Sequence, residues 1–98
     1  MQLIATHTHS PDHCWAREEN EEVAKDWIAG MYDRAEDLGV DLQAAYVTPN
    51  EHAFYFVLET EEFDAVTTFL GPSLLTDHEA HIAPVLSFER AEEALLED

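Results

Sequence analysis

Three of the six histidines and the only cysteine fall within Thr6–Cys14, which reads THTHSPDHC. His7 and His9 stand two residues apart in a segment with strand-like alternation, so both imidazoles lie on one face of a strand. Such a pair, completed by a third imidazole or a thiolate, is a ligand set for Zn²⁺, Ni²⁺ or Cu²⁺ that leaves one coordination position open. Cys14 follows the strand within loop reach. The segment therefore predicts a metal site that includes His7, His9 and Cys14.

Two other interpretations fit the same residues. Histidines can line the mouth of a polar pocket and hydrogen-bond to carboxylates without a metal. Histidines can also act in catalysis, although a Cys14 nucleophile would need a base and an oxyanion hole that the sequence does not show. The residues leave a metal site, a polar pocket and a catalytic site open, and they do not decide whether the protein is an enzyme.

The spacing of apolar residues predicts the element order β-α-β-β-α-β followed by a helix. In the first helical region the apolar stripe consists of Val23, Trp27, Met31, Ala35 and Leu38. The predicted elements are a strand at 2–9, a helix signalled at 10–12 and again at Asn20 that ends at Gly39, strands at 42–48 and 52–59 around a hairpin at 49–51, a helix from Thr60 to Gly71-Pro72, a strand at 76–86 and a helix capped by Ser87.

This order is the split βαβ arrangement of the ferredoxin-like fold, in the α+β class, with residues 1–98 forming one domain. Its antiparallel sheet has the strand order 4-1-3-2, which places the end of the first strand beside the start of the fourth. His78 is therefore predicted to join the site, whereas His81 has the opposite parity. His52 is predicted to lie at the other end of the sheet, out of reach of His9 within one subunit.

The third predicted strand is apolar on both faces. His52, Phe54, Phe56 and Leu58 share one face, and Ala53, Tyr55 and Val57 share the other. Two helices can cover only one face of the sheet. The simplest cover for the second face is a second copy of the chain, so the pattern predicts a homodimer.

The charge is the strongest feature of the composition, with 22 acidic residues against four basic ones and a net charge of −18. This composition is typical of halophilic proteins of the haloarchaeal cytoplasm, because molar salt screens the self-repulsion of the carboxylates. The sequence has no basic stripe of the kind that binds nucleic acid, and it has no apolar run long enough for a membrane span. The N-terminal segment lacks signal-peptide features. A lone cysteine fits a reducing compartment, so we expect a cytoplasmic protein.

Four segments, THTHSPDHC, AYVTPNEHAFYFVLET, FLGPSLL and IAPVLSFERA, resemble the small dimeric α/β-barrel proteins, in particular short prokaryotic domains of unknown function in that group. The resemblance implies a face-to-face dimer and a pocket between sheet and helices that involves Tyr46, Phe54 and Phe56. Proteins with this fold include cofactor-independent monooxygenases, haem-degrading enzymes, stress-response proteins and a nickel-binding group.

The resemblance also implies a histidine and a cysteine after the first strand and a histidine before the third. His9, Cys14 and His52 match this pattern, which keeps open a role for His52 as a ligand or pocket residue, reached across a dimer. The leading prediction is a homodimer that binds Zn²⁺, Ni²⁺, Cu²⁺ or a small ligand through His7, His9, Cys14 and His78. The alternatives are a small enzyme of the cofactor-independent monooxygenase type, with an apolar pocket, and a purely structural or regulatory dimer.

Overall fold

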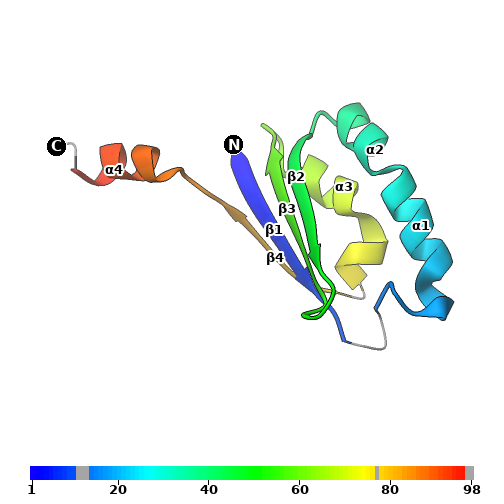
Figure 1. Cartoon of the computed structure of the whole chain (residues 1–98). Coiled ribbons are helices and arrows are strands. Elements are labelled where there is room, and N and C mark those ends of the chain that lie inside the picture. The colour runs from blue at the N-terminus through cyan, green and yellow to red at the C-terminus, as the bar shows by residue number, and fades with distance from the viewer. Residues whose placement is uncertain (11–13, 77, 97–98) are drawn as a thin grey trace.

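Alternating apolar residues build a four-stranded antiparallel sheet in the computed structural model, which describes residues 1–10, 14–76 and 78–96. Its strand order is β2-β3-β1-β4, the predicted order 4-1-3-2 read from the other edge, so the α+β, ferredoxin-like prediction is confirmed. Helices α1, α2 and α3 lie on one face of the sheet (Figure 1). The elements are β1 (Gln2–Thr8), the 3₁₀ helix η2 (Glu18–Asn20), α1 (Glu21–Ala29), α2 (Met31–Asp37), β2 (Asp41–Thr48), β3 (Ala53–Glu59), α3 (Phe63–Thr76), β4 (Glu79–Pro84) and α4 (Phe88–Leu96).

The core lies between the sheet and these three helices. Alternation along β1 and β3 turns one set of side chains toward the helices, where they are buried against apolar residues of α1, α2 and α3. Polar groups reinforce this packing, because the Trp27 indole donates to the Leu70 carbonyl at 2.9 Å and the Arg34 guanidinium donates to the Phe69 carbonyl at 2.9 Å. The core residues include Leu3, Ala5, Trp27, Met31, Ala35, Val40, Phe56, Leu58, Val66, Phe69, Leu70 and Leu74.

Several predicted boundaries need correction. The first helical stripe is divided at Gly30 into α1 and α2, and Val23 is exposed rather than buried. The second helix does break at Gly71, as predicted, where φ is +72°, but a further helical segment follows the break, so that α3 extends to Thr76. The last strand is correspondingly shorter than 76–86. The helix start predicted at 10–12 lies largely outside the described residues.

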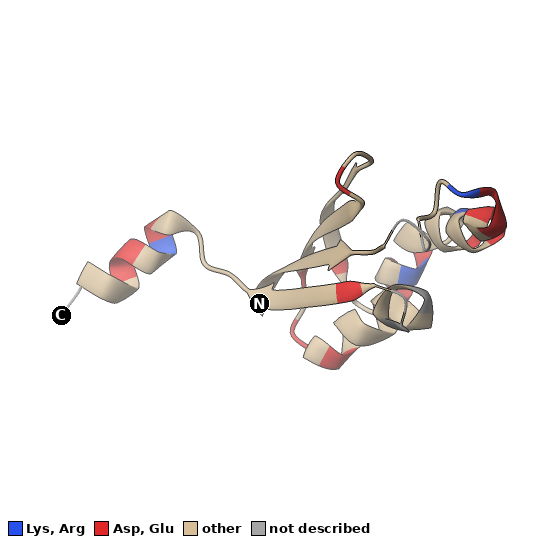
Figure 2. Cartoon of the chain, turned by 90° about the horizontal axis from the view of Figure 1, so that it is seen from below, with Lys and Arg blue, Asp and Glu red and all other residues tan. Residues whose placement is uncertain are grey.

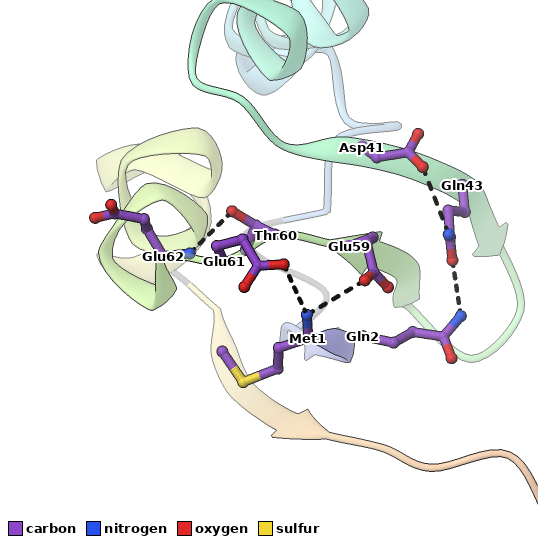
Figure 3. A network of polar contacts seen from close by, with 8 residues as sticks. All are labelled: Met1, Gln2, Asp41, Gln43, Glu59, Thr60, Glu61 and Glu62. Atoms are coloured by element: carbon purple, nitrogen blue, oxygen red, sulfur yellow. Dashed lines mark hydrogen bonds and ion pairs between the residues drawn. The ribbon is translucent and has the colours of Figure 1, made fainter. Parts of the chain in front are cut away.

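A polar network joins the N-terminus to the end of β3 (Figure 3). The Met1 amino group lies 3.2 Å from a carboxylate oxygen of Glu59 and 4.0 Å from one of Glu61. On the neighbouring strand the Gln2 amide donates to the Gln43 side chain at 2.7 Å. These contacts fix the end of the sheet that lies far from His9, because Gln2 pairs with Glu59 and Thr8 pairs with Ala53 at opposite ends of the same ladder.

The sheet face opposite α1–α3, here called the open face, carries Ile4, Tyr55 and Val57, which are partly or fully accessible. Helix α4 projects away from the rest of the chain (Figure 1). Its apolar residues are accessible, with Phe88 93% and Leu95 78% exposed. Two apolar surfaces of the described chain are thus without a cover in the single copy.

Acidic residues are gathered on the helices, α4 included, while the strands carry few of them (Figure 2). In β2, β3 and β4 the acidic residues Asp41, Glu59 and Glu79 each stand at a strand end. Among the described residues no helix has the length and apolar character needed to cross a membrane.

Candidate functional site

Antiparallel pairing of β1 with β3 brings the end of the first strand next to the start of the third. Thr8 pairs with Ala53, and beyond this pair the His9 amide donates to the His52 carbonyl at 3.3 Å. The imidazole rings of His9 and His52 have centroids 5.3 Å apart. Our expectation that His52 lies at the opposite end of the sheet from His9 is therefore wrong, because in an antiparallel pair the end of one strand meets the start of the other.

His9, Cys14 and His52, here called the His–Cys group, each offer one ligand atom, and these atoms lie within 4.8 Å of one another. His9 directly follows β1, and His52 directly precedes β3. The Cys14 carbonyl accepts hydrogen bonds from the Arg17 amide at 3.1 Å and from the Asn20 side-chain amide at 2.9 Å. These two bonds hold the cysteine backbone to the segment that enters α1.

His52 has a left-handed backbone conformation, with φ +54°. It is the only described non-glycine residue with a positive φ. Histidine, asparagine and aspartate adopt this region more readily than most side chains, although it still costs free energy relative to a glycine. The turn 49–52 thus holds the His52 imidazole against His9 at a small conformational cost.

His7 and His78 lie beside the group rather than within it. The His78 ring centroid is 4.9 Å from that of His9 and 6.3 Å from that of His7. His7 is fully buried, and burial together with the neighbouring His78 lowers its pKa from 6.5 to about 4, against a small opposing effect of the Leu74 backbone. His7 is therefore neutral at pH 7. His81 is exposed, 3.5 Å from Glu79.

Of the four predicted metal ligands, the structure brings His9 and Cys14 together with His52, places the His78 ring next to that of His9, and places the His7 ring next to that of His78. Sequence reasoning from strand geometry alone missed His52. The signal that identified it was the resemblance pattern of a histidine immediately before the third strand.

A cavity of about 390 Å³ opens next to the His–Cys group, between α1, α2 and the β2–β3 half of the sheet. All four residues predicted for the pocket, Tyr46, His52, Phe54 and Phe56, contribute to its lining. Tyr46 pairs with Tyr55 of the open face and is 67% exposed, so its side chain has the parity of the open face although the residue borders the cavity.

Sequence reasoning did not assign Trp15 and Trp27 to this pocket, although both line it. Trp15 directly follows Cys14 in the sequence, and its ring centroid is 5.1 Å from that of Phe54. This adjacency was the one signal that could have placed an aromatic side chain beside the cysteine.

The donor atoms of the group fit a transition metal. Around tetrahedral Zn²⁺, nitrogen and sulfur ligands lie about 3.3–3.6 Å apart, as bond lengths of about 2.0–2.3 Å require. The three atoms must therefore approach one another by up to about 1.5 Å from their 4.8 Å limit, a movement within the range of side-chain rotation. Two imidazoles and one thiolate leave a fourth position open to a water molecule or ligand.

Comparison with known structures shows similarity to a crystal structure of SCO4226 from Streptomyces coelicolor A3(2). The two share 16% sequence identity and a TM-score of 0.53, over 89% of this chain and 100% of that chain. At this identity the likeness supports the fold alone. No protein-family profile and no curated protein sequence matches the chain.

Proposed function

We propose that this protein binds a divalent transition metal, Zn²⁺, Ni²⁺ or Cu²⁺, through His9, Cys14 and His52. The observation that carries the proposal is that two imidazoles and a thiol from two distant segments of the chain place their donor atoms within 4.8 Å of one another. Nitrogen and sulfur donors suit these metals and disfavour Mg²⁺ and Ca²⁺, which take oxygen ligands. The His78 ring lies against that of His9, and the His7 ring lies behind it against that of His78.

The experiment is metal analysis of untagged protein, followed by titration of metal-free protein with Zn²⁺. We expect about one Zn²⁺ per chain for the wild type and at least a 10-fold loss of affinity in His9→Asn and His52→Asn. Asparagine tolerates the left-handed conformation, so His52→Asn preserves the turn while removing the imidazole. His81→Asn is the matched control, because this histidine is exposed on β4. Equal affinity in all four proteins would contradict the proposal.

We further propose that the functional form is a homodimer in which a second copy covers the open face. Ile4, Tyr55 and Val57 form an accessible apolar strip on this face, and α4 carries exposed Phe88 and Leu95. An isolated amphipathic helix of this length is marginal in water, and it gains stability when its apolar side packs on another surface. A partner subunit offers cover for both surfaces at once.

From the charge alone, we also propose that this is a halophilic protein of the haloarchaeal cytoplasm. With a net charge of −18, each chain repels itself and its partner unless salt screens the carboxylates.

The cavity supports a second candidate function, an enzyme of the cofactor-independent monooxygenase type that holds an apolar substrate among Phe54, Phe56 and Trp27. In that case metal-free protein would bind the substrate as well as metal-loaded protein does.

A further inference from the structure

The described residues that line the cavity beside the His–Cys group include no acidic or basic side chain, although the protein as a whole is strongly acidic. The chain has 22 acidic and four basic residues, yet none of the described residues that line the cavity is aspartate, glutamate, lysine or arginine. A wall without charged partners does not compensate the desolvation of a charged ligand. Away from the His–Cys group, the lining therefore disfavours charge on the part of a ligand that packs there.

The walls of the cavity are aromatic. The Trp15 ring centroid lies 5.8 Å from that of Trp27 and 5.1 Å from that of Phe54, and the Trp27 and Phe56 centroids lie 5.5 Å apart. Rings at these separations make stacked and edge-to-face contacts, and a flat guest ring makes the same contacts with them. The volume of about 390 Å³ lies near the lower end of the range of small-ligand sites, which suits a molecule of one or two rings.

The donor atoms of the cavity are gathered at one end. His9, Cys14 and His52 line it there, at the hairpin end of the sheet, while Ala24, Ile28 and Met31 line the helix side. A metal held by three protein donors keeps one position for a further ligand. The site therefore combines a single coordinating end with an apolar aromatic body.

We propose that the His–Cys group and the cavity form one site, which takes a neutral, planar aromatic molecule that carries a single nitrogen or sulfur donor. The donor lies at the His–Cys end, and the ring packs against Trp15, Trp27 and Phe54. This inference rests on the proposed metal-binding function, and it adds the class of ligand.

The probes are imidazole and 4-phenylimidazole, which share one donor and differ by an apolar ring. Protein loaded with Co²⁺ in place of the native metal reports ligation through its visible absorption bands, and each probe is titrated into it. Burial of the phenyl ring predicts that 4-phenylimidazole binds about 100-fold more tightly than imidazole.

Two neighbouring alanines provide the matched variants. Ala45 lines the cavity, whereas Ala44 pairs with Val57 and has the parity of the open face. Ala45→Trp fills the cavity, so we expect it to take up Co²⁺ but to lose most of the 100-fold preference. Ala44→Trp should keep the preference.

A second pair on α1 avoids a large insertion into the fold. Ile28 lines the cavity and is 56% exposed, and Val23 is 46% exposed without belonging to the described lining. Ile28→Asp should reduce the affinity for 4-phenylimidazole at least 10-fold while leaving that for imidazole within about 2-fold. Val23→Asp should change neither.

Equal affinity of Co²⁺-loaded wild type for the two probes would overturn this inference and leave the proposed metal binding intact. A preference that survives both Ala45→Trp and Ile28→Asp would also overturn it, because the phenyl ring would then lie elsewhere. Failure of the wild type to take up Co²⁺ or Zn²⁺ would overturn the proposed function together with the inference.

Discussion

His7 gives the protein a specific sensitivity to acid. Its side chain is fully buried on β1, and neither ring nitrogen makes a hydrogen bond of standard geometry within the described structure. Burial and the neighbouring His78 hold the pKa of His7 at about 4, against an ordinary value of 6.5. Between these two pH values the unfolded chain takes up a proton at His7 that the folded protein excludes.

Because the unfolded state binds more protons in this window, the free energy of unfolding falls as the pH is lowered from about 6.5 toward about 4. A pKa of about 4 in the folded state gives a loss of about 2 kcal/mol at pH 5 and about 3 kcal/mol at pH 4, relative to pH 7.5. His7→Leu removes this titration and keeps a side chain of similar size in the core. It should also be at least as stable as the wild type at pH 7.5, since leucine leaves no unsatisfied buried nitrogen.

The assay is urea unfolding of metal-free protein in about 2 M KCl, followed by circular dichroism at pH 7.5, 6 and 5. Protonation of the many carboxylates changes the stability of both proteins, so the informative quantity is the difference between wild type and His7→Leu. We expect that difference to shift by about 2 kcal/mol against the wild type between pH 7.5 and pH 5. Parallel pH profiles would refute the assignment of a depressed pKa to His7.

Three further outcomes follow from the packing and the charge. Val57→Asp should give folded monomer by light scattering in high salt, and Phe56→Asp, in the core, should abolish the fold; two folded dimers would refute a buried open face. Dialysis from molar KCl to ~10 mM buffer should unfold or dissociate the protein as the Debye length grows to about 30 Å, and unchanged dichroism and size would argue against a halophilic protein. Arg34→Met should lower the free energy of unfolding by about 1–3 kcal/mol in chemical denaturation. The reason is that the guanidinium donates a hydrogen bond to the Phe69 carbonyl and lies 4.7 Å from the centroid of the Trp27 ring. An unchanged denaturation midpoint would show that this interaction is dispensable.

Much of the fold follows from local pattern. Alternation in β1 and β3 and the spacing of Trp27, Met31 and Ala35 set the elements, and the βαββαβ order restricts the sheet to few topologies. The predicted ends of helices and strands were less accurate where local sequence signals compete with tertiary packing. Gly71 and Pro72 carry strong stop signals, yet Leu74 is buried in the core, and its burial stabilises a helical segment beyond the break.

The sequence by itself determined the donor types of the candidate site, since His9 and Cys14 stand in one short segment. Only the tertiary structure decided which donors meet. Antiparallel pairing set His52 against His9 across 43 residues of chain, and burial turned His7 and His78 toward the core side. Local periodicity fixes the face on which a side chain lies, whereas the end of the sheet at which it lies depends on the pairing of distant strands.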